Sequence, residues 1–443
     1  MTTPQRFPAY SFPKGFLWGT ATSAHQVEGH NTRNNWHQWE QEHGRILDGS
    51  TSGRACGWWE GHWREDLDRA AVAGQNAHRC SLEWSRLQPA PETWDDDAIA
   101  FYRALLEGMH ARGLCPLVTL HHYTDPQWFA DEGGWLGRRA VQRFRAYATG
   151  VIERFGDLCV DWCTFNEPNA LVLQSYVGGY YPPGKRNILL ALCAAVHIAR
   201  AHTTAFEVIH HIAPEARVGI VVLHYDIQPL YPQRKGNVRL IGMIARLVND
   251  FFADAVIRGQ FPAFLPFPSR DLRPGALDFY GLNYYTGVEL GWTPWRKRHL
   301  GFSFRYPPEA PRSPSGLVAH YPEGFRRVLD HVAGYGVPVI ITENGIDDAD
   351  DRLRPRYIVE HLREAAAAIS RGMRIEGYFH WSLVDNFEWE KGWTHHFGLW
   401  EMDPETLVRR ERASARLYAD ICHANGFTDG IAHEHEAMLR VAE

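Results

Sequence analysis

Two glutamates, each adjacent to an asparagine, are the main candidates for catalytic residues. Glu167 lies in the segment TFNEP at 164–168, and Glu343 lies in ITENG at 341–345. A single glutamate of this kind is more often a helix cap or an ion-pair partner than a catalyst. Two together can divide the work of glycosidic bond cleavage, because one protonates the departing oxygen while the other attacks or supports the developing oxocarbenium carbon.

The aromatic content of the chain agrees with a carbohydrate ligand. The sequence holds 17 Trp, 18 Tyr and 22 Phe in 443 residues. Sugar rings bury their C–H faces on the flat, apolar surfaces of Trp and Tyr side chains. The aromatic residues therefore support the chemistry that the two glutamates suggest.

The elements that must position these glutamates alternate along the chain. Short apolar or β-branched segments predict strands at 16–21, 76–82, 114–121, 160–166, 217–223, 277–283, 337–342 and 375–381. Apolar residues at three- and four-residue spacing predict helices at 63–73, 96–112, 138–155, 188–211, 243–258, 324–334, 355–371 and 410–424. Eight such units without a composition break predict a single (β/α)₈ TIM barrel that spans residues 1–443 as one catalytic domain.

A barrel of this kind would bring the two glutamates to one rim. Glu167 follows the fourth predicted strand and Glu343 the seventh. The loops that follow the strands build the active-site face of such a barrel. The connections 22–60 and 284–322 are too long for simple turns, so we expect them to be long active-site loops.

Composition excludes several other classes of protein. The 46 Lys and Arg against 52 Asp and Glu give a net charge of −6, which does not favour a nucleic-acid partner. No phosphate-binding or dinucleotide-binding glycine motif and no H-E-x-x-H occurs, so no cofactor and no metal is expected. No apolar segment approaches the length of a membrane span and the N-terminus does not resemble a signal peptide, so we expect a cytoplasmic protein without a membrane partner.

Several motifs together resemble one known family. They are FPKGFLWGTAT at 12–22 with QVEG at 26–29, R-x-S-x-x-W-S-R at 79–86, NEP at 166–168, NYY at 283–285, TENG at 342–345, and WSL at 381–383 with DNFEW at 385–389. In this order, across nearly the whole chain, they resemble glycoside hydrolase family 1, the β-glucosidase and β-galactosidase family.

The resemblance implies a retaining mechanism with Glu343 as nucleophile and Glu167 as acid and then base. A retaining enzyme requires about 5 to 5.5 Å between the two carboxyl groups. By similarity, Arg79 and Tyr285 hydrogen-bond the nucleophile, and Asn166 reaches the 2-hydroxyl of the sugar. We expect the like charge of Glu343 to be the nearest reason for Glu167 to stay protonated.

The resemblance also implies a substrate pocket. Its residues are Gln26, His121, Glu388 and Trp389 for the sugar hydroxyls, Trp381 as the stacking floor, and Asn283 and Phe397 beside them. On this assignment His122 takes the place where tryptophan often follows the histidine. The loops 176–185 and 292–306 match no motif closely enough to name the aglycone.

The sequence therefore predicts an exo-acting β-glycosidase, foremost a β-glucosidase with possible β-galactosidase or β-fucosidase activity. Its substrates would be small β-glycosides or short oligosaccharides, and its oligomeric state stays open. One alternative is a 6-phospho-β-glycosidase, although Glu388 would repel a phosphate. Others are an endo-acting cellulase and a catalytically inactive sugar-binding protein.

Overall fold

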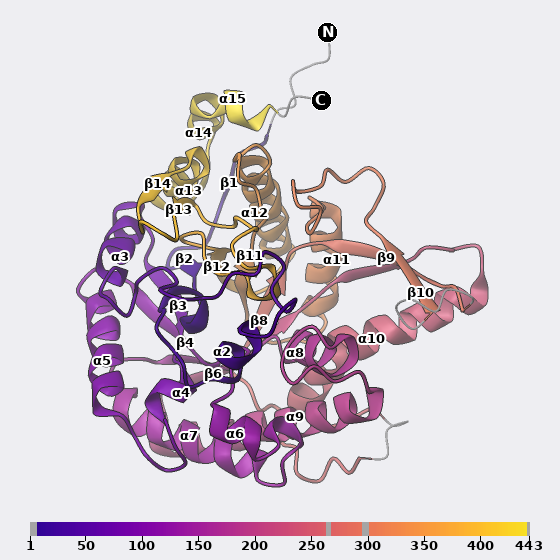
Figure 1. The fold of residues 1–443 in the computed structure, drawn as a ribbon. Helices are drawn as coiled ribbons and strands as arrows, with labels where there is room; N and C mark the ends of the chain where they lie inside the picture. Colours follow the sequence, from indigo (N-terminus) through magenta and orange to yellow (C-terminus); the bar gives the residue numbers. More distant parts are fainter. Residues whose placement is uncertain (1–6, 263–266, 295–300, 441–443) are drawn as a thin grey trace.

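The computed structural model describes residues 7–262, 267–294 and 301–440, and a closed parallel barrel stands at its centre (Figure 1). The strands follow one another around the barrel in the order β11, β12, β2, β3, β4, β5, β6, β8. They are β2 (Leu17–Ala21), β3 (Ala77–Ser81), β4 (Cys115–His121), β5 (Asp161–Asn166), β6 (Arg217–Leu223), β8 (Phe279–Tyr284), β11 (Val339–Asn344) and β12 (Ile375–Trp381). The predicted TIM barrel is confirmed, since all eight strands lie close to their expected positions.

Helices surround this barrel (Figure 1). They are α3 (Trp63–Val72), α5 (Asp96–His110), α7 (Ala140–Phe155), α9 (Ile188–Ile212), α10 (Lys235–Arg258), α11 (Pro322–Ala333), α12 (Arg354–Ser370) and α13 (Ala413–Ala424). Local chemistry sets where some of them begin. The Asp95 carboxylate accepts from the backbone N–H of Ala98 and so caps α5, whose first turn carries two more acidic residues.

Side chains from all eight strands fill the barrel interior. The cluster includes Ala21, Ala77, Leu117, Cys163, Val221, Phe279, Ile340 and Phe379. Large and small residues alternate: a Cβ atom on Gly19 would lie 2.6 Å from the ring of Phe379, and one on Gly219 would lie 2.5 Å from that of Phe279. The interior is therefore a packed core, and a ligand must bind above it, at the strand ends.

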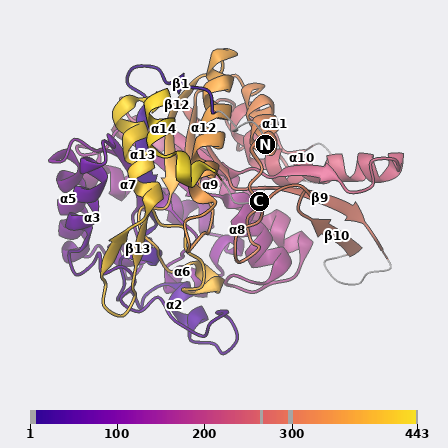
Figure 2. The ribbon, with the colours of Figure 1, turned by 90° about the horizontal axis from the view of Figure 1, so that it is seen from above.

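The two long connections contain more structure than the sequence predicts. Residues 22–60 include α1 (Ala24–Val27) and α2 (Asn35–Glu40), and residues 284–322 include β9 (Gly287–Trp292) and β10 (Phe302–Arg305). The last two pair with each other and, through β9, with β7 (Asp226–Pro229). Figures 1 and 2 show this small sheet beside α10, at one side of the barrel.

Helix α10 begins eight residues before its predicted start. Its first turns lie beside the small sheet, where the Asn237 side chain accepts a hydrogen bond of 2.9 Å from the backbone N–H of Trp292. This contact joins segments 55 residues apart in the sequence, so a local apolar pattern could not reveal it.

Helix α9 corrects one expectation. It is long and apolar enough to cross a membrane by length and composition, so the prediction that no segment approaches such a length is wrong. Of the most apolar 18-residue stretch of this helix, 56% is buried inside the fold. There the helix contacts α7, β5 and β6. That is the behaviour of a barrel helix.

Candidate active site

The two glutamates lie at strand ends and line one cavity of about 150 Å³. Glu343 belongs to β11, and Glu167 directly follows β5. The strand register shifts just before each, between Ile341 and Glu343 against β8 and between Cys163 and Asn166 against β6. Such irregularities re-aim side chains beside active sites. Both carboxyl groups are thereby directed to the same rim, as the sequence predicts.

Glu343 is held by a cation and a phenol. The Arg79 guanidinium donates from Nη1 to Oε1 of Glu343 and forms a buried ion pair with it. The Tyr285 hydroxyl donates to Oε2 over 2.6 Å. Both donors favour the carboxylate form and fix its plane, as a nucleophile requires. The structure thus brings Arg79 and Tyr285 to the positions that the resemblance implies.

Glu167 has neutral partners instead. The Tyr123 hydroxyl donates to its Oε2, and Asn283 Nδ2 donates to Oε1 over 2.6 Å. Burial, followed by the negative charge of Glu343, raises the pKa of Glu167 to about 8. The expectation that Glu343 is the main cause is therefore corrected, because loss of hydration in the buried site is the larger effect. A carboxyl group in this state suits a general acid at neutral pH.

Asn166 connects the two carboxyl groups. Its Oδ1 accepts from Arg79 Nη2 over 2.8 Å and from Asn283 Nδ2 over 3.3 Å. Arginine only donates, so this contact fixes which end of the Asn166 amide is oxygen, and that oxygen in turn fixes the amide of Asn283. The Asn166 Nδ2 group then faces Nε2 of His122 at 3.0 Å.

Aromatic side chains form much of the cavity wall. Trp381, Trp389 and Phe397 all line it, and the two indoles are each 3% exposed. The ring of His122 lies roughly parallel to both indoles, with centroids 6.0 Å from Trp381 and 6.1 Å from Trp389. Flat apolar rings next to polar groups suit a sugar, which presents both C–H faces and hydroxyls.

Glu388 adds a half-buried carboxyl group to the same wall. Its Oε2 accepts a hydrogen bond of 3.2 Å from Gln26 Nε2. Burial and the negative charges of Glu390 and Glu343 hold the pKa of Glu388 well above its usual range. Gln26 is fully buried, also bonds Asn386 and Ser23, and lies behind Glu388 rather than among the residues that line the cavity.

His121 differs from its predicted place. Its Nε2 pairs with Asp125 at 3.0 Å and its ring packs edge-on against Trp135, away from the residues that line the cavity. The next residue, His122, lines the cavity in its place. Successive side chains at a strand end point to opposite sides, so the assignment is corrected by one residue. Tyr123, and not His122, then follows the histidine of the pocket.

Seven further residues line the cavity but belong to no recognisable sequence motif. They are Tyr123, Tyr181, Leu223, Tyr225, Thr286, Leu317 and Val318. For four of them the available signal was position, because Leu223 ends β6 and Tyr123, Tyr225 and Thr286 lie two residues beyond the ends of β4, β6 and β8. The aromatic segment 292–306, in contrast, contributes none of its described residues to this cavity.

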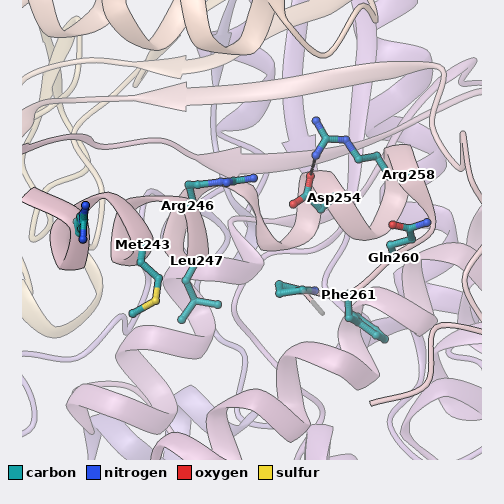
Figure 3. Close-up of a pocket in the computed structure, with 9 residues that line it drawn as sticks. Met243, Arg246, Leu247, Asp254, Arg258, Gln260 and Phe261 are labelled. Atoms are coloured by element: carbon teal, nitrogen blue, oxygen red, sulfur yellow. Dashed lines mark hydrogen bonds and ion pairs between the residues drawn. The ribbon is translucent and has the colours of Figure 1, made fainter. Parts of the chain in front are cut away.

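A larger cavity, of about 560 Å³, lies along α10 and has a different character (Figure 3). Arg246 and Arg258 line it together with Met243 and Phe261, and Arg258 is paired with Asp254 at 2.7 Å. Among the described residues that line it, Asp254 is the one carboxylate and Phe261 the one aromatic side chain. Size alone therefore does not identify the site, whereas the chemistry of the lining residues does.

One group among the described residues could hold a metal ion. Asp420, Glu434 and His435 bring their ligand atoms within 4.8 Å of one another near the C-terminal end. His435 Nε2 already lies at hydrogen-bond distance, 2.6 Å, from Asp420 Oδ2, so a hydrogen bond accounts for the proximity of these two groups. It lies outside the residues that line the carboxylate cavity.

Comparisons with known proteins point in one direction. Residues 9–427 match the model of glycosyl hydrolase family 1. The chain is 30% identical to β-glucosidase A of Thermotoga maritima over 94% of its own length and 99% of that protein, and 30% identical to a β-galactosidase of Sulfolobus acidocaldarius over 96% and 97%.

Solved structures agree with this result. A β-glycosidase from Pyrococcus horikoshii superposes with a TM-score of 0.88 at 35% identity, over 96% of this chain and 98% of that one. The Thermotoga maritima β-glucosidase in complex with deoxynojirimycin superposes with a TM-score of 0.88 at 30% identity, over 95% of this chain and 100% of that one.

Proposed function

This chain is a β-glycosidase of glycosyl hydrolase family 1, and from that premise we propose that it is a retaining, exo-acting β-glucosidase that also accepts β-galactosides and β-fucosides. The observation that supports this most is the pair of Glu167 and Glu343 on one small cavity, each with its own set of hydrogen-bond partners.

The proposed reaction has two steps. In the first, Glu167 gives its proton to the glycosidic oxygen, the bond to the anomeric carbon breaks, and the Glu343 carboxylate bonds to that carbon. In the second, Glu167 takes a proton from water, the water oxygen bonds to the anomeric carbon, and the ester to Glu343 breaks. Two inversions leave the sugar in its original configuration.

The size of the cavity supports exo action on one terminal sugar. Its 150 Å³ is below the roughly 300–1,000 Å³ of sites for drug-sized ligands. Glu388 and His122 supply polar atoms for sugar hydroxyls, and Trp381 and Trp389 supply flat apolar surface. None of the described lining residues is Lys or Arg, which disfavours the 6-phospho-β-glycosidase.

The test compares aryl β-glycosides that share one leaving group. We expect the highest kcat/KM with the β-glucoside, measurable turnover of the β-galactoside and β-fucoside, and none of the α-glucoside, because that ratio reports transition-state binding. Proton NMR of the first product should show the β anomer. A preference for the 6-phospho-glucoside, or an α product, would overturn the proposal.

A further inference from the structure

Tyr123 touches the acid Glu167 although no motif marks it. It lies two residues beyond the end of β4, and its side chain is buried against Trp389 and Tyr181, with ring centroids at 5.1 Å and 5.5 Å. Its backbone is left-handed, with φ of +71°. A bulky side chain rarely adopts this conformation, which turns the phenol back toward Oε2 of Glu167.

The hydrogen-bond network decides which oxygen of Glu167 can carry the proton. The amide of Asn283 has its Nδ2 toward Oε1, because the same Nδ2 also donates to the oxygen of Asn166. An amide N–H donates to an oxygen that carries no proton, so Oε1 is the unprotonated oxygen of Glu167. The proton that Glu167 gives to substrate is therefore held at Oε2, beside the Tyr123 hydroxyl.

We propose that Tyr123 is a positioning residue that holds Oε2 of Glu167 in both of its protonation states. A phenol can donate or accept, unlike the amide of Asn283 on the other oxygen. It donates to Oε2 when Glu167 is ionised, and it accepts when Oε2 carries the proton and no substrate is present. The proposal rests on the proposed function, in which Glu167 alternates between acid and base.

Other groups face Glu167 from every side and set the background for this contact. They are Glu343 on β11, Arg79 on β3, Asn283 on β8, and Tyr285, Tyr181 and Tyr225 in the loops after β8, β5 and β6. Tyr123 and Asn283 lower the pKa of Glu167, whereas burial and Glu343 raise it. Burial and the charge of Glu167 hold the pKa of Tyr123 well above its usual range, so its hydroxyl keeps its proton.

The test is Tyr123→Phe, which removes one oxygen and keeps the ring. We expect the basic limb of kcat/KM to move to higher pH by about half a unit to one unit, since a donor to the ionised carboxylate is lost. The loss of kcat/KM should reach about tenfold for alkyl glycosides and stay within about threefold for dinitrophenyl glycosides, which need little protonation.

Tyr147→Phe is the matched control. It removes a buried phenol that donates to the carbonyl of Leu120 over 3.2 Å and does not line the cavity. Its pH profile and leaving-group dependence should match those of the parent. Equal losses on both substrate types in Tyr123→Phe, with an unmoved basic limb, would overturn the proposal and reduce Tyr123 to a packing residue.

A direct titration separates this proposal from the proposed function. The Glu167 carboxyl, followed by infrared or carbon NMR in the parent and in Tyr123→Phe, should titrate at higher pH in the variant. This measurement needs no turnover. A parent that hydrolyses no β-glycoside would refute the proposed function, whereas an unchanged or lower carboxyl pKa in the variant would refute the role of Tyr123.

Discussion

The ends of β11 and β5 present two glutamates that are about equally buried yet differently held. Glu343 is 3% exposed and Glu167 is 5% exposed. Arg79, which keeps its charge at all accessible pH, contacts Glu343 directly, whereas the hydrogen-bond partners of Glu167 are the uncharged Tyr123 and Asn283. The degree of burial alone therefore does not show which glutamate is the nucleophile and which is the acid. A fixed cation suits a permanent carboxylate, and uncharged partners leave a carboxyl group free to gain and lose a proton.

Removal of the carboxylate at the β11 end should have the largest effect. We expect Glu343→Gly and Glu343→Ala to lower kcat by more than about 10⁴-fold, because no covalent glycosyl-enzyme can form. Added azide should restore turnover from the vacated face and yield the α-glycosyl azide. A β-glycosyl azide from either variant would contradict the assignment of the nucleophile.

Removal of the Glu167 carboxyl group, at the end of β5, should slow the first step by an amount that depends on the substrate. Glu167→Ala should spare the first step for glycosides with very good leaving groups and slow it by about 10²- to 10⁴-fold for alkyl glycosides and disaccharides. Azide should here give the β-glycosyl azide, since it attacks the glycosyl-enzyme from the opposite face. An equal loss of kcat/KM on both substrate types would show that Glu167 is not the acid.

Substitution of Glu388 tests whether the third carboxyl group of the cavity belongs to the sugar-binding wall. Glu388→Ser should lower kcat/KM on unphosphorylated glycosides by the equivalent of about 2 to 3 kcal/mol, because a sugar hydroxyl loses a strong hydrogen bond to this half-buried carboxyl group. Deoxy substrates that lack the contacted hydroxyl should lose correspondingly less. Unchanged kcat/KM on the preferred sugar would remove Glu388 from the binding site.

The sequence predicted most of the barrel because each strand is short, apolar and locally recognisable, as in β6 with its buried run of valines and isoleucine. It predicted the carboxylates because they occur in motifs. It could not predict what depends on backbone direction after a strand. His121 and His122 are chemically identical, and only the geometry at the end of β4 decides which one reaches the cavity.

Two further features of the structure could not be predicted from the sequence for the same reason. The left-handed backbone of Tyr123 turns its phenol toward Glu167, and nothing in a single sequence marks a non-glycine residue for that conformation. The pairing of β9 with β7 joins segments about sixty residues apart, which local periodicity does not report. Both features arise from tertiary contacts.

The final prediction concerns pH and separates the two causes that keep Glu167 protonated. Its pKa of about 8 lies far above the usual value, so the acid is present below that pH and is lost as the pH rises through it. The kcat/KM profile should therefore be bell-shaped with a basic limb near pH 8, and both limbs belong to the coupled pair.

Replacing Glu343 with a neutral residue should lower the pKa of Glu167 only in part. In Glu343→Gln the like charge is gone but burial remains, and burial is the larger cause. We therefore expect the Glu167 carboxyl, followed by infrared or carbon NMR, to titrate below the parent value yet above the 4.5 of an ordinary glutamate. A value that did not move would leave burial as the whole explanation. A fall to the ordinary value would make Glu343 the main cause. The partial fall would also explain the catalytic cycle, because a glycosyl group on Glu343 removes the same charge and turns Glu167 from acid to base.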